Sequence, residues 1–540
     1  MSQVDKLKAE IYRLKKELKE KKKYGLVWED KPEDVVEMCK TKLPVLKEVK
    51  SKEILTDKNK PVNLLIEGDN YHALSVLNYT HKGKIDVIYI DPPYNKGSKD
   101  FKYNDVWVDA EDSYRHSKWL SFMSKRLQLA KPLLKKGGVI FISIDDNELA
   151  QLKLSCNGIF GEQNFVGTIT WEKRTKAQNT ETAKEMLQSK TEYILVYKKE
   201  IDKIRFKLEV FGEKKYGLQD DRGLYRLKLI EEMSARGMRG RQTMIFPIKG
   251  IKPRNGYQWK FGKDQIDKFK CRNDIEILDG KPYFKMRPQD EVKQKFIPFW
   301  SHFFDKDTYG TAEKGKSELT EILGNNEHEF ETVKPINLIK KLLFHINRNG
   351  NEIVLDFFAG SGTTGHAVLN FNDTDQGKRT FILCTNNEEN ICTDICYPRV
   401  QKAIKGYKSP KGKKIDGLGG NLKYFKTDFV EAEPNDGNKM KLTEQATEML
   451  CIKENTFELV LNRKKFKIFK NNNQYTGIIF DQMAIPQFKK AIQSTKAKFS
   501  VYIFSLSDDT FDEEFENIKQ KVKLSPIPET ILRVYRRIFK

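Results

Sequence analysis

The sequence predicts an α/β protein built on a doubly wound, mainly parallel sheet. Short apolar strand segments alternate with helical segments, and several strand segments end at acidic residues, where loops of such sheets bind ligands. The alternation stops in the middle of the chain and then resumes, which predicts one domain inserted into another. At 540 residues, the chain is long enough for several domains.

The first alternating region spans residues 61–200. We expect its strands at residues 62–66, 85–90, 139–144 and 193–197, because each is a short apolar run bounded by polar or turn residues. A long helical pattern of apolar residues lies between the second and third of these strands, as a parallel crossover requires.

The alternation resumes over residues 331–424, with strands expected at 353–357 and 380–384. Residues 201–330, in between, are predicted to form an inserted domain. This segment is rich in basic and aromatic side chains, including Lys214, Lys215, Tyr216, Arg222, Tyr225, Arg226, Arg236, Arg239 and Arg241. The alternative interpretation is a charged, solvated surface that binds no ligand.

Both ends of the chain are predicted to lie outside the α/β domain. Residues 1–60 are expected to form a helical arm, with an apolar stripe that suits self-packing or a weak dimer contact, at Leu7, Ile11, Leu14 and Leu18. Residues 425–540 are expected to form a small α+β domain that contacts a second copy or a partner protein. Basic residues in this domain leave DNA contact as the alternative.

The composition favours a polyanionic partner. The chain has 98 Lys and Arg residues against 76 Asp and Glu residues, a net charge of +22. No segment has the ~20 consecutive apolar residues of a membrane-spanning helix, and the first residues lack the apolar core of a signal peptide. The three closely spaced cysteines, Cys384, Cys392 and Cys396, have no fourth zinc ligand nearby in sequence. We expect a cytoplasmic protein without a membrane segment or a metal.

The motif Asp91-Pro92-Pro93-Tyr94 directly follows the expected strand at 85–90. A carboxylate and a proline carbonyl are both acceptors, so together they suit an exocyclic amino group, which offers two N–H donors. Tyr94 adds an aromatic face on which a planar base can stack. The alternative is a proline-stiffened turn in which Asp91 caps the following helix.

A glycine-rich turn follows the expected strand at 353–357. It runs through Asp356, Phe357, Phe358, Ala359, Gly360, Ser361, Gly362 and Thr363. With Gly365, its glycines have G-x-G-x-x-G spacing, which permits a cofactor to approach the backbone closely. Dinucleotide enzymes share this spacing. Asp356, near the strand end, suits the ammonium group of a cofactor that contains an amino acid and does not suit NAD. Glu388 suits the ribose hydroxyls of either kind of cofactor.

A second glycine pattern is interpreted as a decoy. Residues 310–317 fit the G-x-x-x-x-G-K-S pattern of a phosphate-binding loop. Asp305, Lys306 and Asp307, rather than a buried strand segment, precede Gly310, and Gly324 interrupts the helical pattern that follows. We therefore expect a basic loop here and not a nucleoside triphosphate site.

In this order along the chain, the two motifs resemble the permuted β class of S-adenosylmethionine-dependent amino methyltransferases of DNA. The segments 24–29 and 65–70, with Lys334-Pro335, add a resemblance to the modification subunit of type III restriction–modification systems, mainly over residues 24–430. D-P-P-Y, rather than S-P-P-Y, is the form associated with adenine in this class.

The resemblance implies a circularly permuted, Rossmann-like methyltransferase sheet that transfers a methyl group from S-adenosylmethionine to N6 of a flipped adenine in double-stranded DNA. Asp91 and the Pro92 carbonyl would hold the amino group, and Tyr94 would stack on the base. Cofactor contacts are implied for the turn 356–363 and for Lys334, Pro335, Asp69 and Glu388. Residues 201–330 would be the target-recognition domain.

The resemblance also implies a homodimer and a separate restriction subunit with helicase and nuclease activity. Four alternatives remain open from the sequence. They are a solitary adenine methyltransferase, a cytosine-N4 or RNA methyltransferase, a catalytically silent DNA-binding clamp and an NAD-dependent dehydrogenase.

Overall fold

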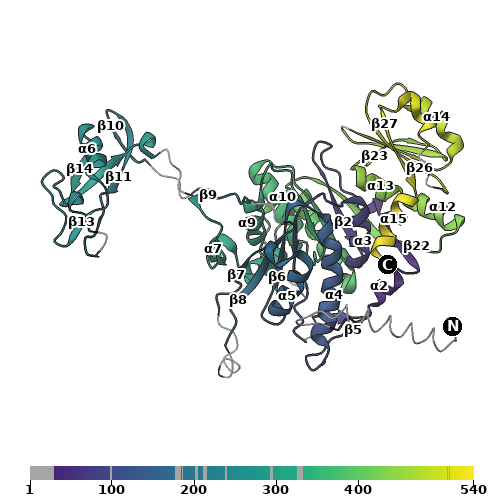
Figure 1. Ribbon diagram of the computed structural model, residues 1–540, viewed down its shortest axis with the longest axis horizontal. Coiled ribbons are helices and arrows are strands. Elements are labelled where there is room, and N and C mark those ends of the chain that lie inside the picture. Colours follow the sequence, from purple (N-terminus) through teal and green to yellow (C-terminus); the bar gives the residue numbers. More distant parts are fainter. Residues whose placement is uncertain are drawn as a thin grey trace, which may run out of the picture. The chain divides into compact units, whose positions relative to one another are not determined.

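The computed structural model describes residues 29–539, except 98–99, 177–183, 185–186, 201–204, 211–215, 238–239, 292–295, 325–331, 473, 508 and 510. It divides into a smaller compact unit, residues 208–299, and a larger unit formed by the rest of the described chain (Figure 1). The expected apolar stripe at Leu7, Ile11, Leu14 and Leu18 lies outside the described residues, as do Lys214, Lys215 and Arg239.

A ten-stranded sheet runs through the larger unit. Its strand order is β1 (Lys42–Glu48), β22 (Asn421–Glu431), β2 (Val62–Glu67), β19 (Thr380–Thr385), β18 (Ile353–Asp356), β3 (Ile85–Ile90), β6 (Leu134–Ile144), β8 (Thr191–Lys198), β7 (Phe165–Glu172) and β17 (His302–Phe303). Only β1 and β8 run antiparallel to their neighbours. The predicted doubly wound, mainly parallel sheet is confirmed.

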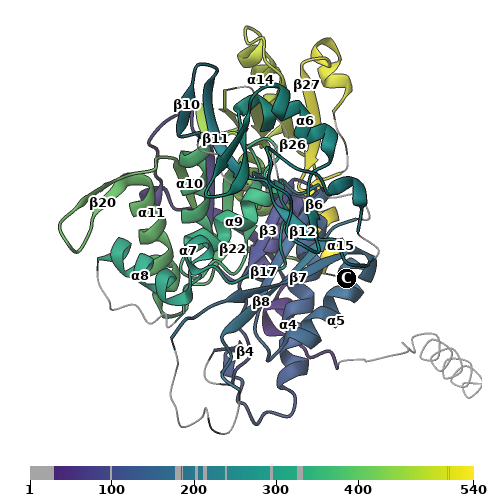
Figure 2. The same ribbon diagram turned by 90° about the vertical axis from the view of Figure 1, so that its left-hand side faces the viewer.

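Two groups of helices cover the sheet (Figures 1 and 2). One group is α3 (Asn70–Thr80), α4 (Arg115–Ala130) and α5 (Leu149–Phe160), and the other is α8 (Ala312–Leu323), α9 (Ile336–Ile346), α10 (Thr363–Asp375) and α11 (Tyr397–Lys405). Alternate strand residues serve the two faces. Leu64 and Ile66 pack in the apolar cluster that contains α3 and α4, whereas the equally buried Leu65 lies outside that cluster.

The winding of the sheet reverses between β18 and β3. The chain from β3 crosses through α4 to β6 on one side, and the chain from β18 crosses through α10 to β19 on the other. The two strands pair directly, Val354 with Val87 and Leu355 with Ile88. Their carboxyl ends therefore meet at a topological switch point, where open α/β sheets bind ligands.

The sheet extends past both predicted boundaries of the α/β domain. β1 lies within the expected arm 1–60, and the expected boundary at residue 424 falls inside β22, which pairs with β1 and β2. Beyond β22, a five-stranded sheet comprises β23 (Glu458–Asn462), β24 (Phe466–Lys470), β25 (Tyr475–Ile479), β26 (Phe499–Phe504) and β27 (Val522–Ile527). Its helices are α12 (Asp436–Gln445), α13 (Thr447–Glu454), α14 (Ile485–Ile492) and α15 (Glu529–Ile538).

The smaller unit has its own sheet and core. The sheet order is β10 (Leu218–Asp220), β11 (Gly223–Leu229), β15 (Lys281–Met286) and β14 (Ile275–Leu278), beside α6 (Lys263–Cys271) and the pair β12 (Glu232–Ser234) and β13 (Tyr257–Trp259). The core residues are Ile230, Ile248, Trp259, Ile266, Phe269, Ile275, Phe284 and Met286. This unit is shorter than the predicted insert 201–330, because β17 pairs with β7 of the main sheet and α8 packs on α11.

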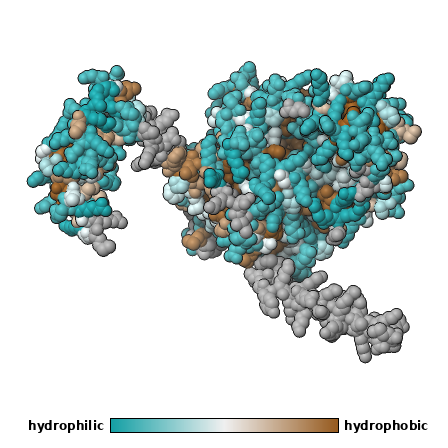
Figure 3. Space-filling model, turned by 45° about the horizontal axis from the view of Figure 1, so that its top comes forward, coloured by the Kyte–Doolittle hydropathy of each residue, from teal (hydrophilic) through white to brown (hydrophobic). Residues whose placement is uncertain are grey.

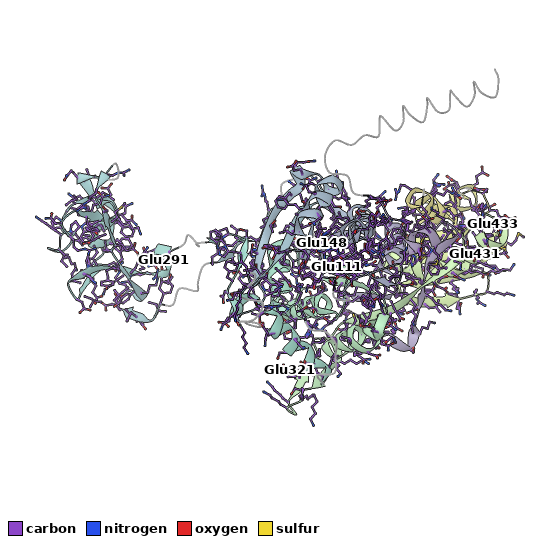
Figure 4. All side chains as sticks on the ribbon, turned by 90° about the horizontal axis from the view of Figure 1, so that it is seen from below. Glu111, Glu148, Glu291, Glu321, Glu431 and Glu433 are labelled. Carbon is purple, nitrogen blue, oxygen red and sulfur yellow. The ribbon has the colours of Figure 1, made fainter. Side chains whose placement is uncertain are left out.

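The basic residues of the smaller unit fall into two classes. Arg226 binds Glu291, labelled in Figure 4, at 2.7 Å, so it contributes to the internal structure of the unit. Arg236, Arg241 and Arg254 are exposed, and the Arg254 guanidinium lies 4.4 Å from the centre of an exposed tyrosine ring. Exposed arginines beside an aromatic ring are typical of nucleic-acid-binding surfaces.

No helix in the described part of the chain is long and apolar enough to cross a membrane. Cys384, Cys392 and Cys396 are buried free thiols. Within the described ranges, no group of three or more His, Cys, Asp or Glu side chains is arranged to hold a metal ion.

The separate cores predict that the smaller unit is destabilised on its own by Trp259→Ala. Trp259 is 1% exposed and its indole N–H donates to the Phe246 carbonyl at 2.7 Å. Its loss should cost that unit about 3–5 kcal/mol of unfolding free energy. Hydrogen exchange followed by mass spectrometry should show faster exchange in residues 208–299 only. Leu224→Ala, at a side chain 51% exposed, is the control, and equal acceleration in both units would contradict the prediction.

Candidate active site

A pocket of about 460 Å³ opens where β2, β19, β18 and β3 end. Eight of its lining side chains are acidic and two are basic: Glu33, Asp34, Asp69, Asp91, Asp100, Asp105, Glu388 and Glu389 against Lys102 and Arg126. The face of the molecule seen in Figure 3 is mainly hydrophilic, and the chain as a whole carries +22. An acidic pocket in a basic protein favours a ligand that carries positive charge.

The Asp91-Pro92-Pro93-Tyr94 turn is held by buried polar contacts. The indole N–H of Trp119, on α4, donates to the Pro93 carbonyl at 2.7 Å. Asn95, the next residue, has a φ of 58°, a left-handed conformation that asparagine tolerates. Its amide donates to Glu148, labelled in Figure 4, at 2.5 Å. Asp91 therefore leaves the end of β3 in a fixed direction, and it lines the pocket together with Pro93.

Asp91 is the first of four charged side chains that contact one another in turn and alternate in sign. We name them the charge cluster: Asp91, Lys334, Glu192 and Lys173. The Lys334 ammonium donates to both Asp91 oxygens at 2.9 Å and lies 3.2 Å from Glu192 Oε2. The Lys173 ammonium lies 3.1 Å from Glu192 Oε1. The Tyr94 hydroxyl lies 2.8 Å from Asp91 Oδ1 and 3.1 Å from Glu192 Oε2.

Charge balance keeps this buried cluster ionised. Burial alone would raise the pKa of Glu192, but Lys334 and Lys173 outweigh it and hold that pKa at about 2. Burial likewise opposes the charge of Lys334, yet Asp91 and Glu192 raise its pKa above the ordinary value for lysine. Glu192 is therefore negatively charged and Lys334 positively charged at neutral pH.

Three predicted residues occupy positions that differ from the expectation. Lys334 does not line the pocket itself; its ammonium contacts Asp91, which does, and the buried Tyr94, and Pro335 lies against Gly310. The Tyr94 side chain is 7% exposed, so the aromatic face expected to carry a base is covered in this structure.

The G-x-x-x-x-G-K-S segment, residues 310–317, packs against the backbone that carries Lys334. Helix α7 (Lys306–Tyr309), and not a strand, precedes Gly310, which agrees with the prediction that this segment is not a phosphate-binding loop. The expected basic loop is wrong, because residues 312–317 belong to helix α8. Thr311 caps α8 by accepting a hydrogen bond from the Lys314 N–H. A Cβ on Gly315 would lie 2.0 Å from the Val333 carbonyl oxygen, so only glycine lets α8 approach the backbone that carries Lys334.

The glycine-rich turn is built around Asp356, which is 2% exposed. Its carboxylate accepts hydrogen bonds from the Phe358 N–H at 3.0 Å and the Thr364 hydroxyl at 2.5 Å. Burial raises the pKa of Asp356 to about 7. Gly362 has a φ of 77°, which favours glycine.

Only part of this turn faces the pocket. Phe357, Phe358 and Gly360 line it, whereas Asp356, Ala359, Ser361, Gly362 and Thr363 do not. The buried Arg399 guanidinium donates to the Thr363 hydroxyl at 2.7 Å and to the Ser361 hydroxyl at 3.1 Å. These hydrogen bonds therefore hold the turn in place through residues that do not line the pocket.

The opposite wall of the pocket depends on a buried arginine. Asp69 caps α3 by accepting from the Tyr71 N–H at 2.7 Å. Arg126 lies 2.7 Å from Glu33 and 3.3 Å from Asp69, so it ties a residue of the N-terminal segment to the pocket. Glu388, on the far side, forms an ion pair with Lys102. Sequence reasoning identified Asp69 and Glu388 but missed Arg126, Glu33, Lys173 and Glu192.

The charge cluster predicts a pH-dependent effect of Lys334→Met. Removing this ammonium leaves buried carboxylates under-compensated, which should cost about 3–5 kcal/mol of unfolding free energy at pH 7. The Glu192 pKa of about 2 lies below its unfolded value, so its contribution is present above about pH 4.5 and is lost as the pH falls. The difference between variant and wild type should therefore shrink on acidification.

Urea unfolding at pH 7, 4.5 and 3 measures this difference. Lys190→Met removes an ammonium that is 55% exposed and lies 3.4 Å from Glu172, and it should change stability little at any of these values. A Lys334→Met effect that is equal at all three pH values would contradict the proposed balance of charges.

Comparison with known proteins places the chain among DNA-modifying enzymes. The sequence pattern of the family described as DNA methylase matches residues 85–395. The type III restriction-modification enzyme StyLTI Mod subunit of Salmonella typhimurium is 34% identical over 364 residues, which cover 60% of this chain and 52% of the relative. The EcoPI Mod subunit of Escherichia phage P1 is 33% identical, with 60% and 58% covered. The chain thus spans little more than half the length of these relatives.

A type II methyltransferase, M.KpnI of Klebsiella pneumoniae, is 33% identical, and the match covers 61% of this chain and 82% of that enzyme. Among solved structures, the cytosine-N4-specific PvuII DNA methyltransferase matches with a TM-score of 0.34 at 10% identity, over 63% of this chain and 87% of that one. That likeness is too loose for a comparison of sites. The family match covers more than half of the chain and includes both motifs, so the chain belongs to the DNA methylase family.

Proposed function

We propose that this protein transfers a methyl group from S-adenosylmethionine to N6 of adenine in DNA, as the modification subunit of a type III restriction–modification system. One observation carries the proposal: the pairing of β18 with β3 sets the Asp91-Pro92-Pro93-Tyr94 turn beside a glycine-rich turn at an acidic pocket. The similarity to type III Mod subunits supports the biological setting.

The residues of the pocket fit the proposed cofactor. S-adenosylmethionine supplies a methyl group on a sulfonium, and its ammonium adds a second positive charge. Gly360 and the phenylalanines before it form one wall, and Asp69 and Glu388 stand on others. We propose that Asp69 lies near the cofactor's adenine, Glu388 near its ribose after leaving Lys102, and Asp356 near its ammonium. Lys334 and Pro335 support the catalytic turn rather than the cofactor itself.

Asp91 and the Pro92 carbonyl are the proposed acceptors for the target amino group. The lone pair of an exocyclic amine is delocalised into the ring, and two acceptors favour the geometry in which it points at the methyl group. The C–S bond breaks as the C–N6 bond forms, and N6 then releases a proton to solvent. A base in a duplex must first leave the stack, at a cost of a few kcal/mol. Stacking of that base on Tyr94 stays a prediction, because the ring is covered here.

The smaller unit is the proposed target-recognition domain, and double-stranded DNA is the proposed substrate. The exposed arginines of this unit suit phosphate and base contacts. We further propose a cytoplasmic homodimer that works with a separate helicase–nuclease subunit, with the region after β22 used for these contacts.

The proposed methyl transfer predicts the effect of a substitution at Asp91. Asp91→Asn should lower the rate of methyl transfer by about 10²- to 10³-fold, the usual effect of removing a pre-organised polar group from an active site. DNA binding should change little, since phosphate contacts lie elsewhere. The measurement is transfer of labelled methyl groups to DNA, with mass spectrometry of the nucleosides to distinguish N6-methyladenine from N4-methylcytosine.

Asp146→Asn provides a matched control for this experiment. Asp146 follows the neighbouring strand β6, is exposed and does not line the pocket, so its loss should leave the rate unchanged. Undiminished methylation by Asp91→Asn would reject the assignment, and N4-methylcytosine as the product would favour the cytosine alternative.

The proposed contact of Asp356 with the cofactor predicts that affinity for S-adenosylmethionine depends on pH. The pKa of Asp356 is raised to about 7, so at pH 6 its carboxyl is mostly protonated and attracts a cation poorly. Affinity for S-adenosylmethionine should therefore rise between pH 6 and 7.5, and binding should release a proton from Asp356. Calorimetry in buffers of different ionisation enthalpy counts that proton. The range stays below the α-amino pKa of about 7.7–8.0.

Asp356→Asn should remove both the rise in affinity and the proton release, because an amide does not titrate. Wild-type affinity that is flat over this range would contradict the proposed contact between Asp356 and the ammonium.

A further inference from the structure

Two groups contact both Glu192 and Asp91: the Tyr94 hydroxyl and the Lys334 ammonium. The Tyr94 hydroxyl lies within hydrogen-bond distance of both carboxylates, at 2.8 Å from Asp91 and 3.1 Å from Glu192. The Lys334 ammonium likewise lies 2.9 Å from Asp91 and 3.2 Å from Glu192. A hydroxyl has one proton and donates to one acceptor at a time, so Tyr94 can serve either carboxylate.

The two carboxylates differ in what else they can reach. The Asp91 side chain is 31% exposed and lines the pocket. The Glu192 side chain is 5% exposed, does not line the pocket, and is bound on its other oxygen by Lys173. Asp91 is therefore the carboxylate that can bind a ligand, while Glu192 stays among protein groups.

The reaction changes the charge beside Asp91. As the C–N6 bond forms, positive charge moves from the sulfonium to the target amine. Lys334, which binds Asp91, opposes this movement, and Glu192 offsets the charge of Lys334 at 3.2 Å. Fixed charges that favour the charge developed in the transition state are a main source of catalysis.

We propose that Glu192 is a positioning residue for methyl transfer. When Asp91 turns its lone pairs to the target amino group, Glu192 takes over the Tyr94 hydroxyl and keeps Lys334 paired. Its negative charge also offsets Lys334 while the amine becomes positive. This inference rests on the proposed methyltransferase function, and it assigns to that reaction a residue outside both sequence motifs.

The test is a charge-balance cycle on the full-length protein. Glu192→Gln keeps the shape and an acceptor oxygen but leaves the cluster with a net charge of +1. The expected result is a fall in kcat of about 10- to 100-fold, because an uncompensated charge a few ångströms away opposes the reaction. KM for S-adenosylmethionine should change less than about twofold, since Glu192 does not line the pocket.

The double variant Glu192→Gln/Lys173→Met restores a net charge of zero and should recover most of the lost kcat. A role limited to hydrogen bonding predicts no recovery, because Glu192→Gln has already broken both ion pairs of Glu192 and Lys173→Met adds no hydrogen bond to Tyr94 or Lys334. Glu172→Gln is the matched control and should have the kcat of the wild type. Glu172 is the last residue of β7, directly before Lys173, and it pairs with the exposed Lys190. Urea unfolding of every variant verifies that each protein is folded under the assay conditions.

Two results would overturn the inference while leaving the proposed function intact: wild-type kcat in folded Glu192→Gln, or a loss of kcat that the double variant does not recover. Failure of the proposed function itself looks different, since wild-type protein would then methylate no DNA in the same assay.

Discussion

The site depends above all on the backbone pairing of β18 with β3. Two residues of each strand are in register, and this short ladder brings together the ends of segments that lie far apart in the sequence. The Asp91-Pro92-Pro93-Tyr94 turn leaves one strand and the glycine-rich turn leaves the other. Neither motif would form a site alone, because the acidic pocket needs walls from four consecutive strand ends. The permuted order of the motifs has no effect on this geometry, since strand order and not chain order decides which loops meet.

A second constraint is the close approach of α8 to the chain before α9. The Gly315 position leaves no room for a side chain against the Val333 carbonyl. This contact places the Lys334 ammonium where it meets two carboxylates from different strands. The segment that looks like a phosphate-binding loop is thus explained by packing: its second glycine permits the contact, and its lysine and serine take no part in the charge cluster.

Much of the fold was predictable because parallel strands are apolar on both faces. The strands at 62–66, 85–90 and 380–384 were found within a residue or two for this reason. The edge strand β1 and β7, which lies next to the edge strand β17, were missed, since each is partly exposed and its pattern is mixed. β22 was missed although its first half is buried, because charged residues interrupt its apolar run. The expected domain boundaries at residues 60 and 424 therefore do not coincide with the limits of the sheet in the sequence.

The motifs identified residues that carry local signals, but not their partners. Asp91 and Asp356 stand at strand ends in recognisable patterns. Lys173 and Glu192 lie at the ends of antiparallel strands, and only the tertiary fold brings them to Lys334. Arg126 reads as one basic residue on an amphipathic helix, and nothing in its spacing indicates a buried ion pair with Glu33. Long-range charge pairs of this kind have no period in the sequence.

The way the smaller unit is joined to the larger one has a consequence for how such proteins diversify. Just before the insert, the Lys207 N–H donates to the His345 carbonyl at 2.8 Å, and just after it, the Ser301 carbonyl accepts from the Thr170 N–H at 2.9 Å. Both attachments use backbone groups, which every residue except proline supplies in full. His345 Nδ1 also lies 2.7 Å from the Lys207 carbonyl, so on the side of the insert these hydrogen bonds use backbone groups that most residue types can supply. With the DNA-reading role proposed for this unit, exchange of the whole insert by recombination between genes would change the DNA specificity in one step and leave the large sheet unchanged.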